Sequence, residues 1–524
     1  MEYQWRTLGV VSAGTLMAAI DTTVVVIAFP HIAEDLHASL VSMVWVLMVY
    51  ILMGTALVLS LGRVADMKGR KRLYSAGFVV FVVGSALCAL SQNAAELIGF
   101  RALQGVGAAM LFANSFALLS DAFPATERGR AFGLNTVIWG AGAIGGIVLG
   151  ALILSVADWR WIFWVNVPIG IVGTALALLL LRESVTPNPR ETFDFPAAGM
   201  FTAALAAILF GITEGILNGW SAPIALIPLL VSVPLLLGFV LWELYMSRDP
   251  ILPLALFRNW LFSASLLSSM LQGVALFAAN FLLMVYYQGI LGIPVLNAAA
   301  ILAPFSIALV VVSFFGGRLS DRFGARIVST VGLIAQAAAL LLFSTIDAAT
   351  PLAQVGVYEA LLGVGGGLFF PANTAAIMGS VPRARFGVAS GVMMTLRNSA
   401  TALSYAVAMI AVTSALPLAL SAQLVGGSFS ASDLAGAGLT PAQVESSFLS
   451  GMTIAFRLSA GLVLAAAAFS VLRGRERRIE TGRWVHHPST VAPFVYDPPP
   501  RTAPTPESAA PASHGEPSPA GRPV

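Results

Sequence analysis

Long apolar runs alternate with short polar connectors over most of this chain. The runs reach about nineteen residues, which is enough to cross the hydrocarbon core of a bilayer as a helix. In lipid a spanning segment must satisfy its own backbone hydrogen bonds, and a helix does so. The pattern therefore predicts an all-α membrane protein with fourteen transmembrane helices, near residues 8–29, 41–61, 73–90, 96–119, 131–155, 161–181, 196–215, 222–245, 261–288, 298–315, 327–346, 353–378, 387–412 and 451–472.

The connectors predict the orientation of these helices. One alternating set of connectors carries seventeen Lys and Arg residues, whereas the opposite set carries Arg160 alone. Basic residues concentrate on cytoplasmic connectors. Because the number of runs is even, both termini are expected in the cytoplasm, with the chain in a cytoplasmic (inner) membrane such as that of a bacterium.

Composition narrows the class further. The chain is 58% hydrophobic and only 10% charged, which is too little polar surface for a soluble globule. Its net charge of +3 is spread over connectors and tail, so no nucleic-acid partner is expected. A single cysteine, Cys88, excludes an intrachain disulfide. No metal-spaced Cys/His set occurs, and neither a metal nor a cofactor is expected.

An internal repeat divides the chain. Residues 62–72 align with 317–326 at an offset of 255, matching Asp66 with Asp321. Residues 101–107 align with 359–365 at an offset of 258. Duplicated halves of equal topology are typical of secondary transporters. We therefore expect two six-helix bundles, an inserted two-helix hairpin, an external loop and a disordered cytoplasmic tail, at 1–182 and 251–472, 183–250, 413–450 and 473–524 respectively.

Four separated motifs carry a family resemblance. The connector 62–72 and the segment 97–109 resemble motifs of the major facilitator superfamily. Segments 21–30 and 159–170 resemble its fourteen-helix drug:proton antiporters. The resemblance implies proton-driven multidrug efflux of amphipathic compounds and antibiotic resistance. In the family's antiporter motif this chain has Ile147 and Ala151 in place of a proline and a glycine, which leaves the direction of transport open.

Three ionisable residues inside the runs are candidates for proton coupling. Asp21 matches the first-helix acid of the family, and a carboxyl group at that depth is either a proton carrier or a structural hydrogen-bond acceptor. Arg101 either senses the protonation of Asp21 or forms a static ion pair with it. Glu359 is a second proton site, an attractor of cationic substrate, or a partner of Arg397 or Arg457. Members of the family often have an acid where Arg397 stands, so an anionic or zwitterionic substrate is a further hypothesis.

The repeated connectors predict cytoplasmic gates. A carboxylate beside small glycines can meet a helix N-terminus or an arginine and release it when that side opens. The alternative is a solvated basic loop, which does not explain the paired Asp and Gly positions. The gate residues are Gly62, Asp66, Gly69, Arg70, Gly317, Asp321 and Gly324.

Polar and aromatic residues within the runs are candidates for lining a substrate cavity, although most such residues bridge helices. They are Trp45, Tyr50, Gln104, Asn114, Asn280, Tyr286, Gln288 and Arg397. Gly140, Gly142 and Gly145 match a dinucleotide fingerprint but lie inside a membrane run. We interpret Gly142, Gly146 and Gly150 instead as a helix-packing face.

These patterns predict a proton-coupled antiporter, functional as a monomer, that exports hydrophobic or amphipathic small molecules. The chain has two lysines, neither in a phosphate-binding loop, which excludes an ATP-driven pump. Catalytic motifs of hydrolases and metalloproteases are absent from the sequence, so an intramembrane enzyme is less favoured. A lipid or metabolite exporter and an importer remain alternatives on the same fold.

Overall fold

The predicted all-α membrane architecture is confirmed. A computed structural model describes residues 2–184, 191–287, 291, 293, 295–347, 349–415, 440–474, 476–478 and 484–486. Within these residues thirteen helical segments are long and apolar enough to cross a bilayer. A further helix of 30 residues, α14, coincides with the thirteenth apolar run.

The helices follow the order of the apolar runs. The N-terminal half consists of α1 (Tyr3–Asp35), α2 (Leu40–Lys68), α3 (Arg70–Leu90), α4 (Ala94–Ala122), α5 (Arg128–Val156), α6 (Trp161–Trp164) and α7 (Asn166–Leu180). The inserted pair is α8 (Phe195–Asn218) and α9 (Pro223–Tyr245). After the short 3-10 helix η1 (Leu254–Arg258), the C-terminal half consists of α10 (Trp260–Val285), α11 (Val295–Phe323), α12 (Ala325–Phe343), α13 (Leu352–Gly379), η3 (Arg383–Arg385), α14 (Phe386–Ala415) and α17 (Pro441–Leu472).

Local sequence explains where several helices begin. The side chains of Ser39, Asn93 and Asp194 each accept a backbone hydrogen bond in the first turn of the helix that follows. Gly69 and Gly324 separate consecutive helices with φ of +118° and +89°, a conformation that favours glycine. The two glycines of the repeat thus make equivalent sharp turns, α2 to α3 and α11 to α12.

The last membrane helix begins earlier than its apolar run suggests. The sequence predicts an external loop through residue 450, whereas α17 begins at Pro441. Thr440 and Gln443 form a capping box, which satisfies the first backbone N–H groups. Val444 and Phe448 are buried in the core of the C-terminal half, so the extra turns are held by packing. Residues 416–439 of the predicted loop lie outside the described residues.

The region after α17 also differs from the expected disordered tail. Two short strands, β1 (Glu476–Arg478) and β2 (Trp484–His486), pair antiparallel with Glu476 opposite His486. The rest of the predicted tail, from residue 487, lies outside the described residues.

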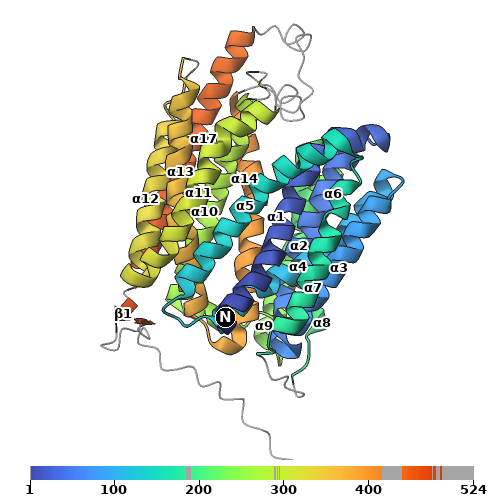
Figure 1. Ribbon diagram of the computed structural model, residues 1–524. Helices are drawn as coiled ribbons and strands as arrows, with labels where there is room; N and C mark the ends of the chain where they lie inside the picture. The colour runs from blue at the N-terminus through green and yellow to red at the C-terminus, as the bar shows by residue number, and fades with distance from the viewer. Residues whose placement is uncertain are drawn as a thin grey trace, which may run out of the picture. The chain divides into compact units, whose positions relative to one another are not determined.

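The two halves pack together at one end only. We call this the basic end; it is where α2, α11 and α17 terminate. Its apolar core combines residues of α1, α4 and α5 with the end of α13 and the start of α14. Toward the opposite end, separate cores belong to the N-terminal half and to the C-terminal half. In Figure 1, α5 and α14 run between the two sets of helices.

Candidate proton and substrate site

A buried carboxylate lies at the centre of a polar cluster in the N-terminal half. Asp21 on α1 is fully buried and forms an ion pair of 2.7 Å with Arg101 on α4. Its other oxygen accepts hydrogen bonds from Gln104 at 2.8 Å and from Asn166 on α7 at 3.0 Å. Side chains of α1, α4 and α7 therefore meet at one carboxylate. A charge buried in a low dielectric is stable only with such partners.

Arg101 is held on all sides. One guanidinium nitrogen also donates to Gln104 at 2.7 Å, and another donates to the Val46 carbonyl on α2 at 3.3 Å. The Tyr50 ring lies 4.3 Å from the guanidinium carbon, close enough for a cation–π interaction. Of the cavity candidates, Tyr50 and Gln104 thus belong to the Asp21 cluster.

The second buried acid has the opposite environment. Glu359 on α13 is fully buried, and neither carboxylate oxygen has a hydrogen-bond partner among the described residues. Of the three alternatives for Glu359, pairing with Arg397 or Arg457 is wrong, because neither arginine forms an ion pair within the described part of the chain. Burying an ionised carboxylate without a hydrogen-bond partner is costly, so this site favours the neutral acid.

The two arginines of the C-terminal half lie in different places. Arg397 on α14 is half-buried, and its guanidinium carbon lies 5.1 Å from the centre of the Phe370 ring on α13. Arg457 is exposed on α17, next to the exposed Leu458. Only Arg397 therefore has its charge within the helix bundle.

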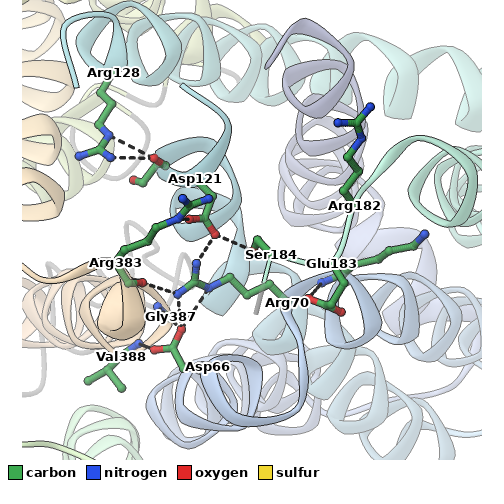
Figure 2. Close-up of polar contacts among 12 residues, drawn as sticks. Asp66, Arg70, Asp121, Arg128, Arg182, Glu183, Ser184, Arg383, Gly387 and Val388 are labelled. Carbon is green, nitrogen blue, oxygen red and sulfur yellow. Dashed lines mark hydrogen bonds and ion pairs between the residues drawn. The ribbon is translucent and has the colours of Figure 1, made fainter. Parts of the chain in front are cut away.

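At the basic end, Asp66 joins the two halves (Figure 2). Its carboxylate accepts hydrogen bonds of 2.9 Å each from the backbone N–H groups of Gly387 and Val388, in the first turn of α14. It also binds Arg70 at 2.6 Å. A carboxylate at a helix N-terminus satisfies free N–H groups and complements the helix dipole. Asp66 therefore caps a helix of the other half.

Arg70 extends this contact into a network. It pairs with Asp121 at the end of α4 and donates to the Arg383 carbonyl at 2.8 Å (Figure 2). Arg383 in turn donates to Asp121 at 2.5 Å, and Ser184 donates to the same carboxylate at 2.7 Å. Acidic and basic side chains alternate in this network. Two of its contacts join the halves, from Arg70 to the Arg383 carbonyl and from the Arg383 side chain to Asp121.

The repeat produces a matching contact on the other side. Asp321, at the end of α11, accepts hydrogen bonds from the backbone N–H groups of Gly129 and Arg130 at 2.8 and 2.9 Å. These groups are in the first turn of α5, the N-terminal half's counterpart of α14. Each half thus caps a helix of the other.

Glycines permit the helices to cross closely where these caps form. A Cβ atom on Gly62 would meet the backbone of Gly387, and one on Gly317 would meet the backbone of Gly129. On α5, Cβ atoms on Gly142, Gly146 and Gly150 would press on α1, at Ala19, Ile20 and Val24 respectively. The structure thus places the last three glycines at a helix-packing face.

The remaining cavity candidates are spread over the molecule. Trp45 donates to Glu214 on α8 at 3.0 Å and therefore faces the inserted pair. Asn114 and Asn280 donate to carbonyls in their own helices, and the Tyr286 hydroxyl donates to Glu445 at the start of α17. Gln288 lies outside the described residues. The structure does not bring these residues together.

A charged cluster also lies at the end opposite the basic end, within the N-terminal half. Asp35, at the end of α1, accepts hydrogen bonds from the Trp159 indole at 3.0 Å and from Arg160 at 2.9 Å. These two bonds hold the pKa of the Asp35 carboxyl below its ordinary value. Arg160 is the single basic residue on this set of connectors, and it is used to join α1 to the α5–α6 connector.

Sequence reasoning missed three parts of the site. Asn166 lies beside Pro168 in an apolar run, and Asp121 and Arg383 lie at helix ends without a distinguishing spacing. A buried arginine after α17, Arg473, also escaped notice; it donates to Asn373 at 3.0 Å and Ser329 at 2.7 Å. Polarity inside or beside an apolar run is the signal that could have found Asn166. Among the described residues no group of acidic, His and Cys side chains is arranged to hold a metal.

Two duplicated halves that meet at one end, each with a buried ionisable group, define a secondary transporter. The chain belongs to the Major Facilitator Superfamily, whose family model matches residues 11–405. It is therefore a multi-pass membrane transporter rather than an enzyme.

Individual relatives agree with this class. The chain is 30% identical to the riboflavin transporter RibZ of Clostridioides difficile over 74% of its own length and 83% of the relative. It is 29% identical to the multidrug transporter MdtP of Bacillus subtilis over 71% and 68%, respectively. The human organic anion transporter MFSD10 shares the fold, with a TM-score of 0.61 at 15% identity, covering 89% of this chain and 99% of that structure.

Proposed function

We propose that this chain is a proton-coupled antiporter that exports amphipathic small molecules from the cytoplasm by alternating access. The observation that carries the proposal is the contrast between its two buried acids. Asp21 is paired with Arg101, whereas Glu359 has no hydrogen-bond partner among the described residues. One site is therefore suited to an ionised carboxylate and the other to a protonated one, in the same conformation.

The contacts at the basic end suggest how protons and conformation are linked. The caps by Asp66 and Asp321 hold the halves together in this conformation. When they part, the halves rock and the surroundings of Asp21 and Glu359 change with them. A proton entering at Asp21 would break its ion pair with Arg101, and one leaving Glu359 would create an uncompensated charge; either event favours a different packing of the helices.

The seventeen basic residues on one set of connectors favour the basic end as the cytoplasmic side of an inner membrane. We further propose the fourteen-helix drug:proton antiporter group, with halves at 1–182 and 251–472 around an inserted hairpin, acting as a monomer. Relatives named as a riboflavin transporter and a multidrug transporter support a small organic molecule as cargo. Export of a lipid or metabolite differs only in the cargo.

Transport in reconstituted vesicles tests the proposal. With an imposed pH gradient, uptake or efflux of dyes, antibiotics, flavins and lipids would be measured for the wild type and for Asp21→Asn. The amide has nearly the shape of the carboxylate but cannot carry a proton, so gradient-driven transport should be abolished. Because the amide also leaves Arg101 without its counter-charge, the unfolding temperature of the variant is measured alongside transport.

Asp35→Asn is the matched control, because Asp35 lies on the same helix with 48% of its side chain exposed. That variant should transport normally. Gradient-driven transport that survives in Asp21→Asn would reject Asp21 as the coupling site, and wild-type transport indifferent to the gradient would reject proton coupling altogether.

A further inference from the structure

Arg397 has an arrangement that none of the contacts above explains. It is half-buried in the middle of α14, away from both helix ends, and it belongs to none of the ion pairs found among the described residues. Its guanidinium lies over the face of the Phe370 ring. Placing a guanidinium inside a membrane bundle is costly, and such groups generally have a functional partner.

The position of Arg397 on α14 indicates where it points. Ser390 donates to the Phe112 carbonyl on α4 at 3.2 Å, and Met394 belongs to an apolar cluster with Val58, Ala109 and Ala113. Ser390, Met394 and Arg397 are spaced by four and three residues, so they share one face of the helix. That face looks toward α2 and α4 of the N-terminal half.

Exposure increases along this face away from the basic end. Ser390 is completely buried and Met394 is 7% exposed, whereas Arg397 is half-buried. The close crossings near Gly387 and Gly391 bring α14 against α2 at the basic end. Arg397 lies six residues beyond Gly391, at a point where the face is only partly covered, and Ser404 and Ala408 further along α14 are again fully buried.

We propose that Arg397 and Phe370 form the substrate-binding subsite for an aromatic organic anion, with the guanidinium binding a carboxylate and the ring contacting the planar body. The inference rests on the proposed function, because it names the substrate class of that transporter. A guanidinium presents paired donors that match a carboxylate, and a stacked ring fixes the plane in which they lie. Arg101 is less suited to this role because its Nε and Nη1 groups already donate to Val46, Asp21 and Gln104 and its charge is paired with Asp21.

Equilibrium binding to the purified full chain, without any pH gradient, tests the subsite. The probes are naphthalene-2-carboxylate and naphthalene-2-carboxamide, which share one apolar body and differ in charge. We expect the carboxylate to bind about 10- to 100-fold more tightly, as a charge-assisted hydrogen-bond pair would give. Equal affinity of the two probes would overturn the proposal.

Three variants locate the effect. Arg397→Gln should bind the carboxylate no better than the carboxamide, and Arg397→Lys should retain part of the preference because it keeps the charge but not the paired donors. Arg457→Gln removes an exposed arginine from a neighbouring helix and should change nothing. If Arg397→Gln and Arg457→Gln lost the carboxylate preference equally, the preference would come from the overall positive charge of the protein, and the assignment would be overturned.

Two further measurements exclude a folding defect and a bound lipid as explanations. Carboxamide affinity and the unfolding temperature report whether Arg397→Gln is folded; if it is not, the wild-type preference and the Arg397→Lys variant decide. Displacement of the carboxylate by phosphatidylglycerol at comparable concentration would assign the arginine to a lipid headgroup and overturn the substrate role. Because binding needs no gradient, a carboxylate preference without proton-driven transport would reject the proposed function and leave this subsite standing.

Discussion

At Asp21, donors from two helices surround a single carboxylate, whereas Glu359 has none among the described residues. The two acids therefore respond differently to substitution. Breaking a buried pair leaves one charge uncompensated, which costs much more than removing a charge that had no partner. Comparing variants at the two sites therefore separates effects on the stability of the protein from effects on proton coupling.

We predict that Arg101→Ala lowers the free energy of unfolding by about 3–5 kcal/mol. The cause is the unpaired Asp21 carboxylate that remains in the bundle. Glu359→Gln, which keeps the shape of a side chain without a described partner, should leave the unfolding temperature nearly unchanged. Thermal unfolding of both variants in detergent measures the difference.

A double variant provides the control. Asp21→Asn combined with Arg101→Gln should be more stable than Arg101→Ala alone, because no isolated charge remains. Equal destabilisation by Arg101→Ala and Glu359→Gln would contradict the contrast between the two sites.

The sequence predicts the buried acids but not their surroundings. Asp21, Arg101 and Glu359 stand out because each interrupts an uncharged run. Asn166, which completes the Asp21 cluster, is separated from it by 145 positions, and no local pattern links the two. Glu359 and Arg397 are an acid and a base of the same half, yet they form no ion pair, and Arg397 instead contacts Phe370 on the helix that carries Glu359. Only the packing of the helices decides this.

At the scale of elements, the glycines of the repeat set how closely helices approach. Gly62 and Gly317 allow α2 and α11 to contact α14 and α5 backbone to backbone. The paired Asp and Gly positions predict a gate that closes on a helix N-terminus or an arginine, but not which helix. The partners are backbone N–H groups at the starts of α14 and α5. Every residue except proline has such a group, so the sequence does not distinguish these positions.

We predict that Gly62→Leu opens the basic end, because its side chain would collide with the backbone of Gly387. Overpacking of this kind costs roughly 1–3 kcal/mol, so the population of the closed conformation should fall by about five-fold or more. A cysteine replacing the buried Ser390 reports opening through its rate of maleimide labelling, in a Cys88→Ser background.

Gly461→Leu is the matched control, since a Cβ atom there meets nothing within 4 Å. Labelling of the reporter should rise in Gly62→Leu and in Gly317→Leu and stay at the wild-type rate in Gly461→Leu. An unchanged rate in both gate variants would mean that the close crossings do not hold this end shut.

At the scale of the whole molecule, the two halves are related by repeat but are not equally linked. Asp66 caps α14 and also binds Arg70, which reaches Asp121 and Arg383. In the aligned positions of the second half, Ala325 replaces Arg70 and Gly379 replaces Asp121. The arginine and the carboxylate that extend the Asp66 contact are therefore not repeated at these aligned positions beside Asp321.

This asymmetry predicts unequal effects of removing the two caps. Asp66→Ala deletes two hydrogen bonds from the carboxylate to α14 and also leaves Arg70 with one acid fewer, whereas Asp321→Ala removes the bonds to α5. Each bond to a charged group contributes about 1.5–3 kcal/mol. Maleimide labelling at Ser390→Cys should therefore increase in both variants and more in Asp66→Ala. Asp35→Ala, at the opposite end, should leave the rate unchanged. If Asp321→Ala opened the molecule as readily as Asp66→Ala, the Arg70 network would contribute nothing, and closure would depend on the repeated caps alone.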